Sequence, residues 1–208
     1  MDNLFRYDGK FWGTLDEITD IVVLNFLFIV FSIPVITIGA SLTATYSVAL
    51  KKVKGEDVHV TKEFIKRFKE NFKISTVVWI LMIVVGSVLL LDFYISNLIS
   101  DKTLGVMLKL ISTIVGIIFL FNFTYVFPII SKFNNTIKNT IVNSILISIQ
   151  NLPYTIIMLT MNLLCIILMF SLVDYFGYIL FFYMVIGFGI TSYINSIFLN
   201  KIFYKYIN

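Results

Sequence analysis

Five amide side chains interrupt the long apolar runs of the sequence and could carry chemistry there. They are Asn25, Asn122, Gln150, Asn162 and Asn195. An amide both donates and accepts hydrogen bonds without carrying a charge, so each of them could bind a sugar hydroxyl. Amides also join transmembrane helices, at about 0.6 kcal/mol per interhelical hydrogen bond. We expect the structural role for any single amide and keep ligand binding as the alternative.

Catalytic and metal-binding patterns are missing from the sequence. The single histidine, His59, lies close to Glu56 and Asp57, but no second nitrogen or sulfur ligand is nearby. No nucleophile motif and no glycine-rich phosphate loop occurs. The single cysteine, Cys165, lies inside an apolar run, where a thiol behaves as a small hydrophobe. We therefore expect a protein that is not an enzyme and that uses no cofactor and no metal.

Ionisable side chains are almost absent from the apolar runs. Asp92, Lys109 and Asp174 fall only at the ends of these runs. A charge at the centre of a bilayer is costly and is usually retained for proton relays or ion coupling. The sequence therefore disfavours a proton-driven carrier and leaves uncharged solutes open.

The composition indicates an integral membrane protein. Of the 208 residues, 59% are hydrophobic and 13% are charged, whereas soluble domains have about 45 to 50% and about 25%. Apolar runs cover 18–50, 74–93, 106–131, 141–172 and 175–200, and each approaches or exceeds the roughly 20 residues of a spanning helix. We expect an all-α integral membrane protein, a bundle of five transmembrane helices that forms a single polytopic domain over 1–208.

The distribution of basic residues predicts the orientation. Segment 51–73 contains eight Lys and Arg residues against four acidic ones, which marks it as cytoplasmic under the positive-inside rule. Alternation through five spans then places the N-terminus outside and the C-terminus in the cytoplasm. The basic residues are concentrated in the segments expected to be cytoplasmic. The net charge of +4 therefore favours a lipid bilayer and not nucleic acid as the partner.

The first apolar run contains a proline. Pro34 removes a backbone donor and clashes with the preceding turn, so we expect one span kinked at this residue. The 33 residues of 18–50 would extend about 50 Å as a straight helix, whereas the hydrocarbon core is about 30 Å thick. A re-entrant hairpin with the N-terminus inside is the alternative, with two halves of about 24 Å each.

Small residues follow this proline at helical spacing. Gly39, Thr43 and Ser47 recur every four residues, and small residues at that spacing let helix backbones approach closely. We expect a packing seam along this face. In the alternative, the backbone carbonyls freed around Val30 and the hydroxyls of Ser32 and Thr37 face a solute site, as the ends of broken helices do in carriers.

Segment 60–72 has the periodicity of an amphipathic helix. Its phenylalanines are Phe64, Phe68 and Phe72, and its basic residues include Lys66, Arg67 and Lys69. A helix with an apolar side and a basic side is typical of a segment in the membrane interface. We expect a cytoplasmic interfacial helix here, and docking of a cytoplasmic protein partner is the alternative.

A family resemblance rests on the same region. After Asp20 and Asn25, the stretches SIPVITIGASLTATYSVALKKVKGE (32–56) and FIKRFKENFKISTVVW (64–79) resemble the YesL family, also called domain of unknown function 624. The resemblance is dense over about residues 1–85. It implies a multi-pass protein of the bacterial cell membrane, often encoded beside sugar-binding proteins and permeases, and it implies no catalytic residue.

This resemblance provides two functional hypotheses. The first is an accessory or regulatory partner of a carbohydrate uptake system, with subunits of an ATP-driven sugar importer as the candidate partners. The alternative is a small permease or channel subunit that moves an uncharged solute such as a sugar. The sequence gives no indication of the oligomeric state.

Overall fold

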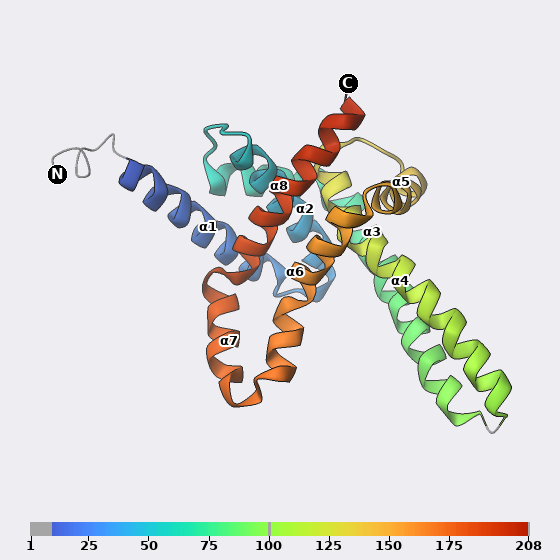
Figure 1. Ribbon diagram of the computed structural model, residues 1–208. Coiled ribbons are helices and arrows are strands. Elements are labelled where there is room, and N and C mark those ends of the chain that lie inside the picture. The colour runs from blue at the N-terminus through green and yellow to red at the C-terminus, as the bar shows by residue number, and fades with distance from the viewer. Residues whose placement is uncertain (1–9, 100, 208) are drawn as a thin grey trace.

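The protein is described by a computed structural model that places residues 10–99 and 101–207. These residues form helices and short connections, without a β-strand among them (Figure 1). The first half contains α1 (Lys10–Ser32), the 3₁₀ turn η1 (Val35–Thr37), α2 (Ile38–Val53), α3 (Val60–Leu98) and α4 (Lys102–Lys132). The second half contains α5 (Ile137–Gln150), α6 (Leu152–Ser171), the 3₁₀ turn η2 (Val173–Tyr175), α7 (Phe176–Phe182), the π-helical turn η3 (Tyr183–Gly187) and α8 (Phe188–Ile207). The expected all-α class is confirmed.

The first apolar run folds as a hairpin of two helices. α1 ends at Ser32, and α2 begins at Ile38 after the η1 turn. Asp20 in α1 forms an ion pair with Lys52 near the end of α2. A continuous helix would separate these two residues by about 48 Å. The prediction of one kinked span over 18–50 is therefore wrong, and the hairpin that was its alternative describes the segment.

Pro34 provides the physical reason for the reversal. Proline lacks the N–H that a continuous helix needs and disfavours helical geometry in the preceding residue, Ile33. Pro34 itself has extended backbone angles, with φ −73° and ψ 110°. A kink would require helical geometry to resume at once, whereas here a separate 3₁₀ turn follows. The tip carries exposed apolar side chains, with Ile33 74% and Val35 62% exposed.

Helix α2 lies at the centre of the bundle. It contacts α1, α3, α4 and α8, and its residues from Gly39 to Leu50 are buried except for the half-buried Leu42. Its Gly, Ala, Ser and Thr side chains are small, which lets several helices approach it closely. With 16 residues it is about 24 Å long, so it cannot cross a hydrocarbon core of about 30 Å alone.

Two hydrophobic clusters lie on either side of α2. One joins α1, α2 and α3 around Leu24 and Phe64. The other joins α2 to α3, α4, α5, α6 and α8 around Tyr125, Met158 and Leu199. The bundle is therefore packed around a short helix of small residues rather than around a transmembrane span.

The amphipathic segment and the second expected span form one helix. α3 runs without a break from Val60 to Leu98, 39 residues in all. The separate interfacial helix predicted over 60–72 is therefore corrected to the first turns of α3, because no helix breaker separates it from the span. α4 returns beside α3. Its first turn is capped by Asp101, whose carboxylate accepts hydrogen bonds from the backbone nitrogens of Thr103 at 2.9 Å and Leu104 at 3.3 Å.

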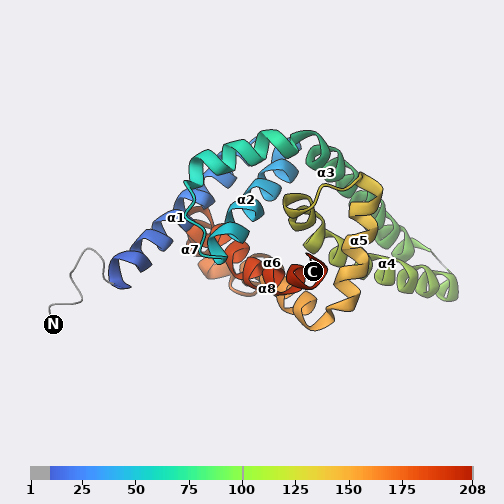
Figure 2. The same cartoon turned by 90° about the horizontal axis from the view of Figure 1, so that it is seen from above.

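The expected span over 141–172 is also two helices. α5 ends at Gln150, and Asn151 leaves the helical conformation with φ −123° and ψ 41°. α6 begins at Leu152, and its next residue, Pro153, cannot supply the N–H that a continuous helix would need. Figure 2 shows α5 lying across the end of the bundle rather than in line with α6. The prediction of a single span here is wrong for the same reason as at Pro34.

Four segments of the described chain are long and apolar enough to cross a membrane. They are α3, α4, α6 and the segment that runs from η2 through α8. The expected five spans reduce to four because α1 and α2 form the hairpin. Much of the outer surface of these helices is apolar and exposed, as for Leu90 at 75% and Phe170 at 80%. The fold is therefore that of a multi-pass helical membrane protein.

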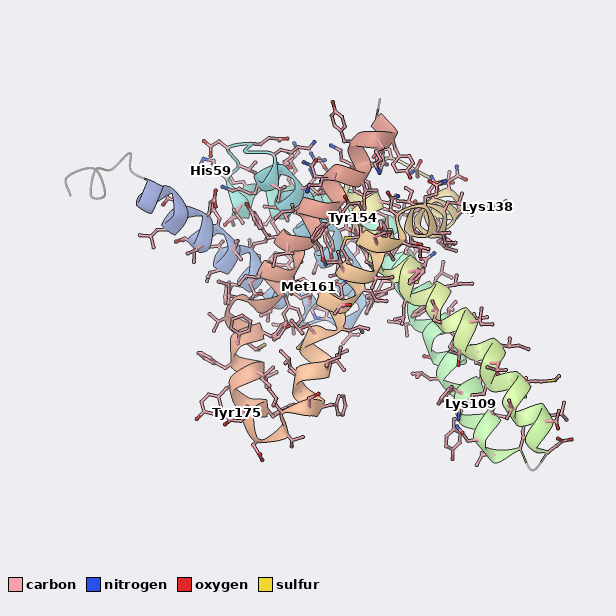
Figure 3. All side chains as sticks on the ribbon, viewed as in Figure 1. His59, Lys109, Lys138, Tyr154, Met161 and Tyr175 are labelled. Atoms are coloured by element: carbon pink, nitrogen blue, oxygen red, sulfur yellow. The ribbon has the colours of Figure 1, made fainter. Side chains whose placement is uncertain are left out.

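Charged and polar markers define the two ends of the molecule. The hairpins α3–α4 and α6–α7 diverge toward one end, where Lys109 and Tyr175 lie, and His59 and Lys138 lie at the other end (Figure 3). Asp16 of α1 lines the same surface groove as His59. The first half of α1 and the basic segment 51–73 therefore lie at one end of the molecule. The hairpin thus returns the chain toward the end of the molecule it came from.

Candidate functional site

The tip of the α1–α2 hairpin satisfies its own backbone polar groups. The Thr37 hydroxyl lies 2.6 Å from the carbonyl oxygen of Phe31 and 2.7 Å from that of Pro34. The indole nitrogen of Trp79 donates to the carbonyl oxygen of Val35 at 2.7 Å. Within a bilayer, backbone groups without internal partners cost several kcal/mol each. Pro34 and Thr37 thus build a closed tip, and these carbonyls are not free for a solute.

The small residues of α2 contact α3 and α4. A Cβ atom on Gly39 would lie 2.6 Å from the carbonyl oxygen of Ser75. The Thr43 hydroxyl lies 2.8 Å from the Ser75 hydroxyl, and the Ser47 hydroxyl donates to the carbonyl oxygen of Ser131 at 3.1 Å. All three predicted residues therefore lie in helix contacts, and Thr43 and Ser47 use their hydroxyls there.

Asn25 clamps the π-helical turn of the last membrane segment. Its amide nitrogen donates to the carbonyl oxygens of Tyr183 at 3.3 Å and Met184 at 2.7 Å, and its amide oxygen accepts from the backbone nitrogen of Gly189 at 2.8 Å. A π turn shifts the helical hydrogen-bond pattern, so an outside partner is needed for the displaced groups. Asn25 is fully buried and has no capacity left for a ligand on its nitrogen side.

A partly open cavity of about 240 Å³ lies between α1, α2, α4, α6, η3 and α8. We call it the central cavity. Its aromatic lining residues are Phe28, Tyr46, Phe123, Phe127, Tyr183 and Phe188, and its polar lining residues are Thr124, Asn162, Thr191 and Ser192. Among the residues that the structure describes, no charged side chain lines it. An apolar wall with a few uncharged polar groups is typical of a small-molecule site.

A polar network with free donors borders the central cavity. The Asn195 amide nitrogen donates to the Asn162 amide oxygen at 2.7 Å and to the Tyr46 hydroxyl oxygen at 3.3 Å. This network joins α2, α6 and α8. In the described part of the chain, neither the Tyr46 hydroxyl hydrogen nor the Asn162 amide nitrogen has an acceptor, and the buried Asn195 amide oxygen has no donor. Since Tyr46 and Asn162 line the cavity, they can donate to a hydroxyl-bearing guest.

Two other predicted amides have structural contacts away from the central cavity. The Asn122 amide nitrogen donates to the carbonyl oxygen of Ile141 at 3.1 Å and joins α4 to α5. The Gln150 amide oxygen accepts from the Tyr206 hydroxyl at 2.6 Å and joins α5 to α8. Of the five amides, only the pair on α6 and α8 belongs to the cavity network.

The phenylalanines of the amphipathic segment are mostly internal. Phe64 is fully buried, and its ring centroid lies 5.3 Å from that of Phe31 in α1. Phe68 packs on the same ring, with a centroid distance of 4.9 Å. Only Phe72 is exposed, at 41%. The apolar side of this segment is thus covered by α1, and little of it remains for a lipid surface or a docked protein.

The basic side of the same segment is partly neutralised. Arg67 donates to Glu63 at 2.7 Å and to Glu70 at 3.1 Å. Lys66 and Lys69 are exposed. A partner that recognises this segment would therefore meet these two lysines rather than the phenylalanines.

Metal-ligating groups do not cluster in residues 10–99 and 101–207. These residues contain no set of three His, Cys, Asp or Glu side chains that could hold a metal ion. His59 lines a shallow surface groove with Asp16 and Asp57. Cys165 is half-buried and lines the central cavity.

Sequence reasoning missed most residues of the central cavity, including several polar ones. Tyr46, Thr191 and Ser192 line it beside the predicted Asn162. One signal was available for Tyr46, which is the single aromatic residue of the small-residue stretch 38–50. Thr191 and Ser192 have no such signal, because hydroxyl residues are scattered through every apolar run.

The comparison with known families agrees with this architecture. Residues 21–93, from α1 into α3, match the family model described as "Protein of unknown function, DUF624". The match confirms the expected family resemblance from the second half of α1 through most of α3. No curated protein and no solved structure gives a significant match to the chain.

Proposed function

We propose that this membrane protein acts by binding and not by catalysis, as an accessory or regulatory partner of a carbohydrate uptake system. In this proposal the central cavity holds one small, uncharged, hydroxyl-bearing molecule. The observation that carries the proposal is the pair of free donors, the Tyr46 hydroxyl and the Asn162 amide nitrogen, at the edge of an aromatic cavity.

The chemistry of the central cavity fits a sugar-like molecule. A sugar ring presents C–H groups that pack on aromatic faces and hydroxyls that both donate and accept. Free donors of the protein satisfy such hydroxyls, and the absence of charge in the lining avoids selection for ions. The volume of about 240 Å³ lies below the roughly 300 to 1,000 Å³ of drug-sized sites, so a single small molecule is the expected guest.

The hairpin favours binding over permeation. A permease that uses the broken first segment would need free polar groups along that segment. Asn25 and Thr37 are engaged in internal hydrogen bonds. The buried hydroxyls of Ser32 and Ser41 have no hydrogen-bond partner among the described residues. A channel or permease subunit therefore remains the alternative outcome of the experiments.

The proposed orientation places the N-terminus and C-terminus on the cytoplasmic side of a bacterial cell membrane. Segment 51–73 shares one end of the molecule with Lys132 and Lys138, and Lys109 lies at the other end. The positive-inside rule assigns the basic end to the cytoplasm. The hairpin then brings α1 to the same side, which revises the orientation predicted from the sequence.

Equilibrium binding to the purified protein tests the central cavity. Neutral monosaccharides are expected to bind. Asn162→Leu is expected to lower the affinity for the sugar at least tenfold, because it removes the free donor at nearly constant side-chain volume. Asn139→Leu, on the exposed side of α5, is the matched control and should change affinity less than twofold. Failure of every neutral monosaccharide, or equal affinity in the Asn162→Leu variant, would contradict the proposal.

Partner capture and uptake test the accessory role. Crosslinking in cells grown on carbohydrate should recover subunits of an ATP-driven importer with this protein. Proteoliposomes that contain this protein alone should show no sugar uptake above empty vesicles. Uptake by the protein alone would replace the accessory role with the permease alternative, and recovery of no importer subunit would contradict the accessory role.

A further inference from the structure

A second cavity lies where α2, α3 and α4 meet at the basic end of the molecule. Its volume is about 140 Å³, and its lining includes the cations Lys51, Lys54, Arg67 and Lys132. Glu56 is the one carboxylate among its lining residues. We call it the basic pocket.

Internal ion pairs account for only part of this positive charge. Lys51 and Arg67 both contact Glu63, at 2.8 Å and 2.7 Å, and Arg67 also contacts Glu70 at 3.1 Å. In the described part of the chain, no carboxylate lies within 4.0 Å of Lys54. The same holds for Lys132. The basic pocket therefore contains two cations that a bound anion can neutralise.

The backbone places Lys54 and Lys132, both exposed, at the ends of the neighbouring helices α2 and α4. Lys54 ends α2 in a turn in which the backbone nitrogens of Gly55 and Glu56 donate to the carbonyls of Lys52 at 2.9 Å and Lys51 at 3.2 Å. Gly55 adopts φ +76°, which a residue with a side chain rarely does, so this glycine fixes the turn. Lys132 ends α4 and lies beside Lys54.

The helix dipole explains why one lysine lies at a helix C-terminus, but it does not explain why Lys54 and Lys132 line the same pocket. A cation at a helix C-terminus gains about 0.3 to 1 kcal/mol from the helix dipole. That gain does not require Lys54 and Lys132 to share one pocket, where their charges repel each other. A group with two or more negative oxygens between them removes the repulsion and uses both ammonium groups.

We propose that the basic pocket binds a phosphate group, supplied by the headgroup of an anionic lipid of the cytoplasmic leaflet. Phosphate oxygens accept from ammonium groups and from the free guanidinium nitrogen of Arg67. A volume of about 140 Å³ accommodates a phosphate group and excludes most of a larger ligand. Basic pockets between membrane helices on the cytoplasmic side bind lipid headgroups in this way.

Lipid titration of the full chain in detergent tests the proposal. Phosphatidylglycerol is expected to bind at least tenfold more tightly than phosphatidylcholine, which has the same phosphate but no net charge. The variant Lys54→Gln with Lys132→Gln should remove most of this preference. Lys138→Gln with Lys201→Gln removes the same charge from exposed positions outside the basic pocket and should leave the preference within twofold.

A variant that binds more tightly must still be folded, so it tests the site without the ambiguity of a variant that loses binding because it misfolds. Glu56→Gln removes the one lining carboxylate and should tighten phosphatidylglycerol binding about threefold or more. Inorganic phosphate is the probe for a soluble source. Millimolar phosphate that displaces phosphatidylglycerol would show that the phosphate site exists and that a soluble phosphate competes for it.

Three results would overturn the proposal. Equal affinity for phosphatidylglycerol and phosphatidylcholine would show that the basic pocket does not select an anion. An equal loss in the Lys138→Gln, Lys201→Gln control would assign the preference to diffuse surface charge. Weaker binding in Glu56→Gln, with unchanged thermal unfolding, would show that the ligand does not occupy this pocket.

Discussion

The indole nitrogen of Trp79 in α3 donates a 2.7 Å hydrogen bond to the carbonyl oxygen of Val35 at the tip of the α1–α2 hairpin. This bond joins the first membrane-crossing helix to a turn that does not cross. Together with the Thr37 hydroxyl, it leaves the apolar tip without free carbonyls at Phe31, Pro34 and Val35. Such closure is what a bilayer requires of any non-helical backbone within it.

Removal of the Trp79 donor should destabilise the hairpin. Trp79→Phe keeps an aromatic ring but leaves the Val35 carbonyl without this partner, so we expect a loss of about 1 kcal/mol in the free energy of unfolding. Tyr178→Phe, on a side chain that is 77% exposed, removes a donor elsewhere and should have no measurable effect. Reversible unfolding in mixed micelles measures both. Equal stability of the two variants would show that the tip does not depend on Trp79.

Asn25 should contribute more to stability than a typical membrane amide. Asn25→Leu keeps the volume but leaves the Tyr183 and Met184 carbonyls and the Gly189 nitrogen without their partner, so we expect a loss of about 2 kcal/mol. Asn139→Leu on the surface of α5 serves as the control. Hydrogen exchange of the Gly189 amide should also become faster in the Asn25→Leu variant. Unchanged exchange there would count against the clamp.

Alanine at two glycines should shift stability in opposite directions. A Cβ on Gly39 would lie 2.6 Å from the Ser75 carbonyl oxygen, so Gly39→Ala must push α2 and α3 apart and should cost about 3 kcal/mol. Nothing lies within 4 Å of a Cβ on Gly116, so Gly116→Ala should gain up to about 1 kcal/mol from helix propensity. Thermal unfolding in detergent compares the two. A neutral Gly39→Ala variant would mean that α2 and α3 are not in close contact.

Alanine substitution of the phenylalanines in segment 60–72 should lower stability strongly at the buried position and weakly at the exposed one. Phe64→Ala should cost about 3 to 5 kcal/mol because the ring is fully buried against Phe31. Phe72→Ala should cost less than 1 kcal/mol because the ring is exposed. If Phe64→Ala instead left stability unchanged and lowered membrane or partner binding, the predicted interfacial role would replace the core role.

The all-α class followed directly from composition and apolar runs, but the topology depended on prolines. At Pro34 and at Pro153 the sequence shows an uninterrupted apolar run, and hydropathy cannot distinguish a kinked span from two helices. Tertiary contacts decide the outcome: the ion pair of Asp20 with Lys52 holds the hairpin, and the contacts of Gln150 with Tyr206 hold the α5–α6 corner. A charged residue such as Asp20 inside the first run was the sequence signal against a span.

The candidate site was only partly visible in the sequence. The amides were recognised, but their roles differ because of partners far away in the chain. Asn25 meets a π-helical turn that no local pattern predicts, and Asn195 meets Asn162 and Tyr46 only after three helices pack. The four-residue spacing of Gly39, Thr43 and Ser47 described one face of α2, whereas the structure buries the whole circumference of this helix.

The re-entrant hairpin is the central claim, and the sidedness of two engineered cysteines tests it most directly. Asp16→Cys in α1 and Asp57→Cys after α2, each in a Cys165→Ala background, are labelled in intact cells with a maleimide that does not cross membranes. We predict that both positions resist labelling in intact cells and react only after the membrane is opened. Labelling of Asp16→Cys but not of Asp57→Cys in intact cells would contradict the hairpin and restore a first helix that crosses the membrane.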